Sequence, residues 1–251
     1  MKSTVYMEDC TPRFHPTMSN DKLGGKKYNM MAVSYVPGKG LLTLKNGNLV
    51  SDCPGTCGNV DCSQCGQRGV CYAIDSYVQY PAVTVNRVEN TMQLRQDIDK
   101  HFQDIKDAIE KNKINIVRYT ESGEFESLEH FEKFVELANN MPNISFYAYT
   151  KNYAALRGFF AKGLELPRNM VILISVWGDQ GVKEYEEFKS HENIKCFAVK
   201  SNIPVDAMCP AYRKDETGKV SRVKSDAVKC SNCGLCTGKR PNVRVIGCIE
   251  H

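Results

Sequence analysis

INIVRYTESGEFESLEHFEKFVELANNMPNISFYAY, residues 114–149, holds the pattern that decides the fold. Its first six and last six residues are apolar runs of strand length. The segment between them contains Ser127, a favourable N-cap residue, followed by apolar residues at the three- and four-residue spacing of one helix face. These residues are Leu128, Phe131, Val135 and Ala138. The stretch therefore predicts a strand, a helix and a second strand.

The same alternation extends in both directions along the chain. Upstream, apolar spacing from Leu94 to Ile109 predicts a helix over roughly 91–112. Downstream we expect helices at 152–163 and 181–190 and strands at 171–177 and 194–199. Strands that alternate with helices pair in parallel through crossover connections. The sequence thus predicts an α/β fold, and periodicity alone fits either an open sheet or a partial barrel.

Composition divides the chain into three parts. Residues 1–27 are polar and lack periodicity, so we expect an N-terminal arm. Residues 28–208 carry the α/β pattern, opening with a hairpin or a bent first strand, and include a cysteine-rich loop at 53–71. Residues 209–251 contain further cysteines and are expected to form a small C-terminal module.

The overall composition favours a globular protein of the cytoplasm. The 251 residues are 42% hydrophobic and 25% charged, which is enough for a sizeable core. No run of eighteen apolar residues occurs and the N-terminus lacks a signal-peptide pattern, so we expect no membrane segment. Twelve cysteines in a reducing compartment indicate metal ligands or catalytic groups rather than disulfides.

The first cysteine group lies in a glycine-rich loop. Its members are Cys53, Cys57, Cys62, Cys65 and Cys71. Such a loop has little apolar surface to bury, so a bound metal or cluster would supply the free energy that orders it. The spacing fits both an iron–sulfur cluster and a structural zinc site.

The second group is centred on CSNCGLC, with Cys230, Cys233 and Cys236. Three cysteines, each separated from the next by two residues, suit three corners of a 4Fe–4S cluster, with a fourth thiolate from a distant position. Cys209 and Cys248 are the two candidates for that fourth ligand. Zinc sites more often use paired cysteines, so the spacing favours iron–sulfur here.

Other chemistries find little support in the sequence. The five histidines lie in separate segments without an HExxH or triad arrangement. His101 and His130 fall within predicted helices and are expected to be exposed. Cys196 alternates within a predicted strand and is expected to be a small core residue, whereas Cys10 has no assigned role.

The segment from Lys200 to Arg244 is basic, with ten Lys or Arg against four Asp or Glu, a surplus of six. A basic segment around a metal site can bind the phosphates of nucleic acid. Solvated surface charge is the commoner explanation, because Tyr212 is the only aromatic residue there that could stack on bases.

Several motifs together resemble the phage gene product 88 family. They are CPGTC followed by CYA, then NRVEN, VRYTESGEF, FYAYTKN and CSNCGLC. The resemblance covers nearly the whole chain from about residue 30. More distantly, the layout is similar to radical S-adenosylmethionine enzymes, in which a partial (β/α) barrel carries a 4Fe–4S cluster on the loop after its first strand. These resemblances imply a partial barrel, two 4Fe–4S clusters, S-adenosylmethionine as a cofactor and an electron donor as a partner.

The second resemblance also implies cofactor-binding residues. Ser122, Gly123 and Glu124 resemble the glycine-rich acidic turn that meets the ammonium group of the cofactor. The alternative is that Glu124 caps the following helix. Lys151 and Ser175 would meet a carboxylate and a ribose. For Ser175, a core hydroxyl bonded to the backbone is the alternative.

The chain departs from the usual radical S-adenosylmethionine pattern of three cysteines separated by three and then two residues. Cys53 and Cys57 keep the first interval, but no cysteine follows at the second. The ligands would be Cys53, Cys57 and Cys71, or Cys57, Cys62 and Cys65. Five thiolates could also saturate a cluster and leave no open iron. The alternatives to an enzyme are an electron-transfer or structural iron–sulfur protein and a metal-stapled nucleic-acid-binding protein.

Overall fold

The computed structural model describes residues 11–18, 25–37, 42–43, 49–50, 73 and 79–249 of the chain. The first cysteine group and Cys10 lie outside these residues. Among the described helices, none combines the length and apolar character needed to cross a membrane.

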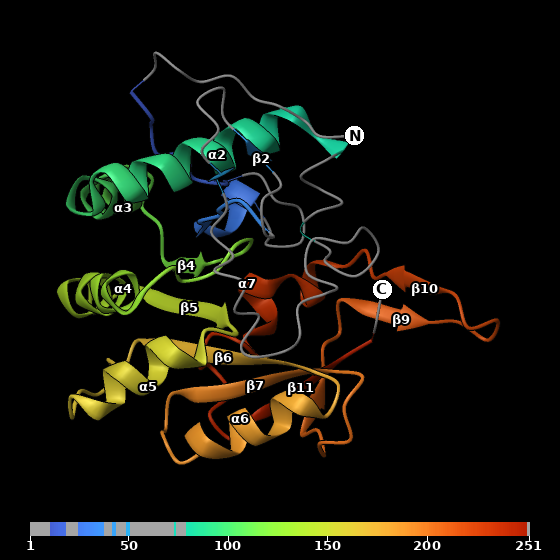
Figure 1. Cartoon of the computed structure of the whole chain (residues 1–251). Coiled ribbons are helices and arrows are strands. Elements are labelled where there is room, and N and C mark those ends of the chain that lie inside the picture. Colours follow the sequence, from blue (N-terminus) through green and yellow to red (C-terminus); the bar gives the residue numbers. More distant parts are fainter. Residues whose placement is uncertain are drawn as a thin grey trace.

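A seven-stranded parallel sheet forms the centre of the described structure (Figure 1). In spatial order its strands are β1 (Met30–Ala32), β4 (Ile116–Tyr119), β5 (Ser145–Thr150), β6 (Met170–Trp177), β7 (Ile194–Val199), β11 (Val245–Cys248) and β8 (Ala207–Met208). Every neighbouring pair is parallel. The first five strands follow one another in chain order, so the α/β prediction is confirmed.

Five helices connect or precede these strands. They are α2 (Pro81–Gln96), α3 (Ile98–Lys111), α4 (Leu128–Asn140), α5 (Tyr153–Ala161) and α6 (Gln180–Phe188). In Figure 1, α3, α4 and α5 are stacked in the same order as the strands beside them. Ser127 caps α4 as predicted, because its side chain accepts a hydrogen bond from the His130 N–H at 3.1 Å.

The helix predicted over 91–112 is wrong in one respect, because two helices occupy this region. Asp97 ends α2 and begins α3, and its side chain accepts a hydrogen bond from the Lys100 N–H at 2.9 Å. Its backbone has φ −155° and ψ 89°, which interrupts the helical path. The first helix also begins earlier than predicted, at Pro81, where proline is tolerated because the first N–H of a helix has no intrahelical partner.

The two faces of the sheet have different coverings. On the helical face, the main core joins strand residues such as Phe146 and Ala148 to side chains from α2 to α6. On the opposite face, a smaller core contains Tyr147 and residues of the C-terminal segment. Side chains alternate along a strand, so Tyr147 and Tyr149 share this second face. Cys196 lies fully buried in the helical core, which confirms its prediction as a core residue, and burial raises the pKa of its thiol to about 12.

The C-terminal segment extends the sheet beyond the strands that the sequence predicted. It contributes β8 and β11, and between them lie β9 (Tyr212–Lys214), β10 (Val220–Arg222), the 3-10 helix η3 (Asp226–Val228) and the one-turn helix α7 (Cys230–Cys233). The antiparallel β9–β10 hairpin projects from the body of the molecule (Figure 1). Near the N-terminus, η1 (Gly25–Tyr28) precedes β1, and a short antiparallel pair, β2 (Leu42–Thr43) and β3 (Leu49–Val50), follows it.

Candidate metal centre

Four predicted ligands gather on the second face of the sheet. Cys209, Cys230, Cys233 and Cys236 pack against its apolar residues. The charges of Cys209 and Cys230 add to burial in raising the pKa of the Cys233 and Cys236 thiols, so the four sulfur atoms are close enough to interact. The structure therefore brings Cys209 to the CSNCGLC motif. We call these four residues the thiol cluster.

Pairing at the sheet edge positions Cys209. This residue directly follows β8, and its N–H donates a 2.7 Å hydrogen bond to the carbonyl oxygen of Gly247 in β11. Cys248 ends β11 and is buried, but it belongs to neither hydrophobic core and its thiol donates to the Ile249 carbonyl oxygen at 3.4 Å. Of the two candidates for a fourth ligand, Cys209 is the one that lies with the other three.

A one-turn helix and the chain reversal that follows it present the remaining three thiols. Helix α7 spans Cys230 to Cys233 and ends at Gly234, which has a left-handed φ of +70°. A Cβ at this position would lie 3.0 Å from the Lys239 Cβ, so glycine suits both the conformation and the close approach. The chain then reverses and carries Cys236 into the interior, where burial raises the pKa of its thiol to about 12.

Polar groups from the sheet surround the buried end of the thiol cluster. The Tyr149 hydroxyl donates a hydrogen bond to Cys236 Sγ at 3.1 Å. The Arg118 guanidinium stacks on the Tyr149 ring, with its central carbon 4.9 Å from the ring centroid. Lys195 of β7 donates from Nζ to the Leu235 and Arg240 carbonyl oxygens, at 3.0 and 2.9 Å. It thereby ties the cysteine-bearing turn to the sheet.

The Tyr147 hydroxyl is a buried donor with no hydrogen-bond partner in the part of the chain that the structure describes. Its side chain is fully buried in the same small core as the thiol cluster. The pKa of this hydroxyl is raised well above its usual value by burial and, next, by the charge of Cys230. Buried polar groups in proteins normally have a partner, so this hydroxyl calls for an acceptor beyond the described residues.

The donor set fits an iron–sulfur cluster better than a single ion. Within the described residues, no three His, Cys, Asp or Glu side chains are arranged to hold a metal ion as they stand. A zinc ion needs its thiolates at about 2.3 Å from one point. The cysteines of a 4Fe–4S cluster bind separate irons and lie farther apart. The four thiols lie near the cations of Arg118 and Lys195 and the hydroxyl groups of Tyr147 and Tyr149. Such surroundings suit an anionic 4Fe–4S cluster.

Glu124 lies at the carboxyl end of the sheet, as predicted, but its carboxylate is enclosed. It accepts hydrogen bonds from Thr150 Oγ1 at 2.7 Å, from the Lys151 N–H at 2.6 Å and from its neighbour Phe125 N–H at 2.9 Å. Burial raises the pKa of this carboxyl to about 7, against the effect of these hydrogen bonds. Glu124 thus joins the loop after β4 to the end of β5. The interpretation of Glu124 as the cap of the next helix is wrong, because Ser127 caps α4.

The two residues before Glu124 hold the same loop against the chain that follows β1. Ser122 Oγ donates to the Tyr35 carbonyl oxygen at 2.9 Å, and the Tyr35 N–H donates to the Ser122 carbonyl oxygen at 2.9 Å. Gly123 has φ +82°, and a Cβ there would lie 2.6 Å from the Tyr35 Cβ. Only glycine permits this close approach.

Lys151 and Ser175 are the two remaining predicted cofactor residues. The backbone of Lys151 donates to Glu124, and its side chain is half-buried at the same edge of the sheet. Ser175 is half-buried near the end of β6, opposite Phe197 of β7 in the sheet register. Alternation along β6 places it on the same face as Leu173, which is the face that carries the thiol cluster.

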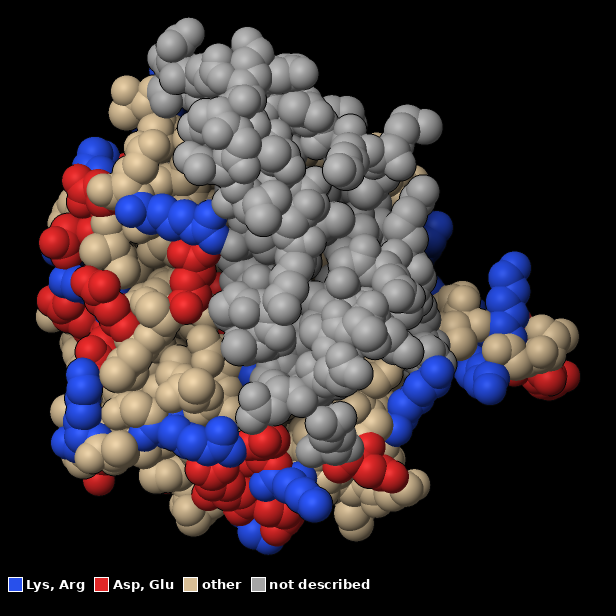
Figure 2. All heavy atoms as spheres, in the orientation of Figure 1, with Lys and Arg blue, Asp and Glu red and all other residues tan. Residues whose placement is uncertain are grey.

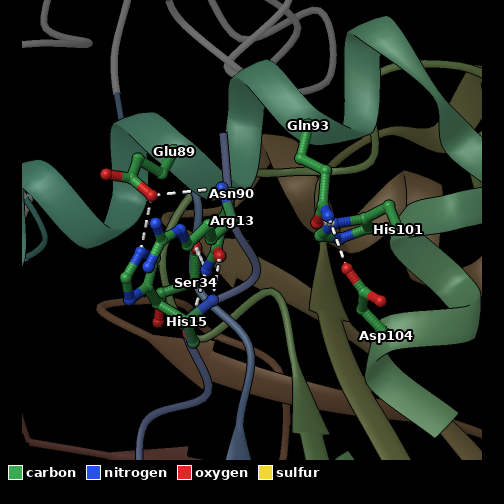
Figure 3. A network of polar contacts seen from close by, with 8 residues as sticks. All are labelled: Arg13, His15, Ser34, Glu89, Asn90, Gln93, His101 and Asp104. Atoms are coloured by element: carbon green, nitrogen blue, oxygen red, sulfur yellow. Dashed lines mark hydrogen bonds and ion pairs between the residues drawn. The ribbon is translucent and has the colours of Figure 1, made fainter. Parts of the chain in front are cut away.

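The sequence missed a buried polar network on the helical face. His101 and His130 were expected to be exposed, which is wrong, because their exposed fractions are 0% and 1%. His101 Nδ1 bonds to Gln93 Oε1 at 2.8 Å, and Gln93 Nε2 donates to Asp104 Oδ2 at 2.6 Å (Figure 3). A signal was present, since His101 lies three residues after Ile98 and four before Ile105, on the predicted apolar stripe.

The network continues inward through two tyrosines and has a defined direction. The Glu126 N–H donates to His130 Nδ1 at 3.2 Å, so His130 Nε2 carries its proton and donates to the Tyr119 hydroxyl at 2.7 Å. The Tyr119 hydroxyl bonds to that of Tyr35, which bonds to His101 Nε2 at 2.8 Å. Both imidazoles are neutral in this arrangement, and burial lowers the pKa of each, that of His101 to about 3.

A second set of contacts in Figure 3 fixes the described part of the N-terminal arm to α2. His15 Nε2 bonds to Glu89 Oε2 at 2.7 Å, and the His15 N–H donates to Asn90 Oδ1 at 2.7 Å. Asn90 also donates to the Ser34 carbonyl oxygen at 2.9 Å. The NRVEN motif therefore contributes two residues that connect the arm, α2 and the chain after β1.

These features define a parallel α/β protein whose C-terminal segment carries a thiol cluster against one face of the sheet. Residues 15–239 match the model of the gene product 88 family. The match covers most of the chain, so the protein belongs to the gene product 88 family. No curated protein and no solved structure matches it.

Proposed function

We propose that the protein is an iron–sulfur protein whose thiol cluster ligates a 4Fe–4S cluster. The observation that carries this proposal is that Cys209 lies with Cys230, Cys233 and Cys236, although 20 residues of sequence separate Cys209 from Cys230. In the same place, the Tyr149 hydroxyl already donates a hydrogen bond to the sulfur of Cys236. Thiolates are the ligands of such clusters, and three cysteines spaced two residues apart are typical of them.

Electrostatics support the same assignment. A cluster held by four thiolates is an anion, and an uncompensated anion in an apolar interior is unfavourable. The positive charge of Arg118 counteracts the effect of burial on the Cys236 thiol, and Lys195 interacts with the same thiol. Two cations and the Tyr149 donor thus compensate negative charge at the buried end of the site.

We further propose a partial barrel and a radical S-adenosylmethionine type of chemistry. The order β1-β4-β5-β6-β7, with helices α2 to α6 packed on one face, supports a partial (β/α) barrel over a doubly wound sheet. The first cysteine group follows β1, where such enzymes hold their reactive cluster. The thiol cluster would then carry an auxiliary cluster. The expectations of an electron donor and a cytoplasmic location belong to this proposal.

The residues proposed to bind S-adenosylmethionine differ in how well their positions fit this role. Ser175 faces the same side as the thiol cluster, and Lys151 lies half-buried at the carboxyl end of the strands. Glu124 already accepts three hydrogen bonds and holds the loop after β4 in place. We therefore assign Ser122, Gly123 and Glu124 the task of shaping this edge of the pocket, and the cofactor would meet the backbone of that loop.

The iron and sulfide content of anaerobically purified protein tests the first proposal. We expect Cys209→Ser and Cys233→Ser each to lose one cluster, which is a loss of about four irons per chain. Cys196→Ala is the matched control, because it removes a buried thiol on the helical face, away from the thiol cluster, and it should keep the full content. Bound zinc without sulfide in the unaltered protein would overturn the proposal.

The enzymatic part is tested by adding S-adenosylmethionine to reduced, cluster-loaded protein and measuring 5′-deoxyadenosine. Formation of this product is expected, with loss in variants of the first cysteine group. If the clusters assemble and no product forms, the protein is a non-catalytic iron–sulfur protein, acting in electron transfer or as a structural element.

Nucleic-acid binding is a second candidate function, favoured by the β9–β10 hairpin. This hairpin projects into solvent and exposes basic side chains, visible in blue at its end in Figure 2. Arg213 lies in β9, and Lys219 lies in the turn just before β10. Binding to single- and double-stranded DNA and RNA should weaken with rising salt. The Arg213→Ala variant should bind more weakly than Lys111→Ala, a matched loss of one exposed positive charge at the end of α3. Equal binding by the two variants, or none by the unaltered protein, would exclude the hairpin as the contact.

A further inference from the structure

We propose that Tyr147 and Tyr149 are hydrogen-bond donors to the sulfur atoms of the thiol cluster and raise the reduction potential of the cluster held there. Tyr149 donates to Cys236, and Tyr147 donates to the Cys230 side of the site. This inference rests on the proposed function of the thiol cluster and adds to it the residues that set its redox properties.

The geometry of β5 supplies both donors. Tyr147 and Tyr149 are two residues apart on one strand, so their rings share the second face of the sheet, with centroids 6.0 Å apart. The Tyr149 hydroxyl donates to Cys236 Sγ at 3.1 Å, so one sulfur contact exists in the protein alone. The Arg118 guanidinium stacks on the Tyr149 ring and helps to hold it in place.

Tyr147 differs from Tyr149 because its hydroxyl has no partner among the described residues. Its side chain is fully buried in the same small hydrophobic core that Cys230 and Cys236 pack against. Leaving a buried hydroxyl without a partner destabilises a protein by roughly 1–3 kcal/mol. When the neighbouring thiolates bind an anionic cluster, the sulfur atoms of the site provide an acceptor for the Tyr147 hydroxyl.

The expected direction follows from charge. Reduction adds one electron to the cluster, and the hydrogen bonds to its sulfur atoms stabilise this added negative charge. Two buried hydroxyl donors therefore favour the reduced form. Loss of either donor should make reduction harder, which is a more negative midpoint potential.

The experiment compares Tyr147→Phe, Tyr149→Phe and the double variant as cluster-loaded full-length proteins. Tyr153→Phe is the matched control, because Tyr153 is equally buried but lies on the helical face, with its hydroxyl donating to the Ser175 carbonyl oxygen at 3.4 Å. Midpoint potentials come from titration with dithionite under anaerobic conditions. A second readout is the rate at which a chelator removes iron from the oxidised protein.

Each single variant should have a more negative potential than the unaltered protein, and the double variant should be the most negative. Iron release should become roughly fivefold faster for each donor lost, as expected for one hydrogen bond. Tyr153→Phe should change neither quantity. An unchanged potential in Tyr147→Phe would overturn the assignment of Tyr147, and an unchanged potential in Tyr149→Phe that of Tyr149.

Failure of this inference is distinguishable from failure of the proposed function. If the unaltered protein assembles no cluster with iron and sulfide, the proposed function fails. If it assembles the cluster and the tyrosine variants match Tyr153→Phe in potential and in iron release, only the present inference fails.

Discussion

Acid should destabilise the protein through the two buried histidines of the helical face. His101 lies fully buried between the Tyr35 hydroxyl and Gln93 Oε1, and its Nε2 accepts the hydrogen bond from the tyrosine. Protonation of Nε2 would remove this acceptor. It would also place an unpaired charge in the core, which is the reason that burial lowers the pKa of His101 to about 3.

The sign and size of the effect follow from the two pKa values. The folded-state pKa is depressed below the ordinary value of 6.5, so the unfolded chain binds the proton first as the pH falls. The contribution to stability is therefore complete above pH 6.5 and is lost progressively as the pH falls toward 3. At pH 5 the loss is about 2 kcal/mol, from 1.5 pH units at 1.36 kcal/mol each. The lowered pKa of His130 acts in the same direction.

The assay is urea unfolding at pH 7.5 and at pH 5.0, followed by circular dichroism, for the unaltered protein and for His101→Gln. The comparison between variants is needed because Glu124 titrates in the opposite direction over this range. The stability advantage of the unaltered protein over His101→Gln should shrink by about 2 kcal/mol between pH 7.5 and pH 5.0.

Tyr35→Phe is the control for this experiment. It removes the hydroxyl that donates to His101 and leaves the titrating group in place, so it should lower stability at both pH values. The reasoning is refuted if the unaltered protein is more stable than His101→Gln by the same free energy at both pH values. That result would mean that His101 titrates alike in the folded and unfolded states.

Three further predictions concern other parts of the fold. Burial raises the pKa of Glu124 from 4.5 to about 7, so its contribution to stability is complete below pH 4.5 and is lost as the pH rises through 7. In urea unfolding, the stability advantage of the unaltered protein over Glu124→Gln should fall by roughly 2 kcal/mol from pH 5.0 to 7.5. A constant advantage would contradict this prediction. Gly123→Ala should lower the free energy of unfolding by about 2 kcal/mol or more, and the control Gly163→Ala, at φ +72° with open space around it, by about 1 kcal/mol; equal losses would argue against the close approach. Lys195→Met should release the turn that carries Cys236, so that this thiol reacts faster with a disulfide reagent; an unchanged rate would mean that packing alone holds the turn.

The strands of the sheet were predictable because their sequence signal is local. Residues 114–119, 144–149, 171–177 and 194–199 are mostly apolar, and each corresponds to a strand with ends shifted by at most two residues. Such runs are typical of parallel strands covered on both faces. The sequence carried this information without any contact between distant residues.

The first part of helix α2 was missed because most of its buried residues are polar. Thr84, Arg87, Asn90, Thr91 and Gln93 are all buried. They are held by hydrogen bonds such as that from Arg87 Nη1 to the Ala73 carbonyl oxygen, at 2.8 Å. Hydrophobic periodicity cannot detect a face of this kind. The same limit explains the histidines, which occupy apolar positions in the helical pattern and were interpreted as exposed because of their residue type.

The choice between Cys209 and Cys248 depended on distant contacts and could not be made from spacing. Strands β8 and β11 have only two and four residues, and neither resembles a long apolar run. Their pairing places Ala207 beside Ile246 and Met208 beside Gly247, and this register carries Cys209 to the thiol cluster. Sequence spacing identified Cys230, Cys233 and Cys236, because all three lie within one short segment of the chain.

The same register connects ligand binding to the stability of the sheet edge. A Cβ at Gly247 would lie 2.6 Å from Met208 Sδ and 2.9 Å from Val205 Cγ1, so the segment that carries Cys209 fits closely against β11. A group that binds all four thiols binds this folded edge more tightly than the unfolded chain, and it must therefore stabilise the edge. The histidine network lies on the other face, among the helices. Metal loading should thus act first on β8 and β11, whereas acid should act first on the helical core.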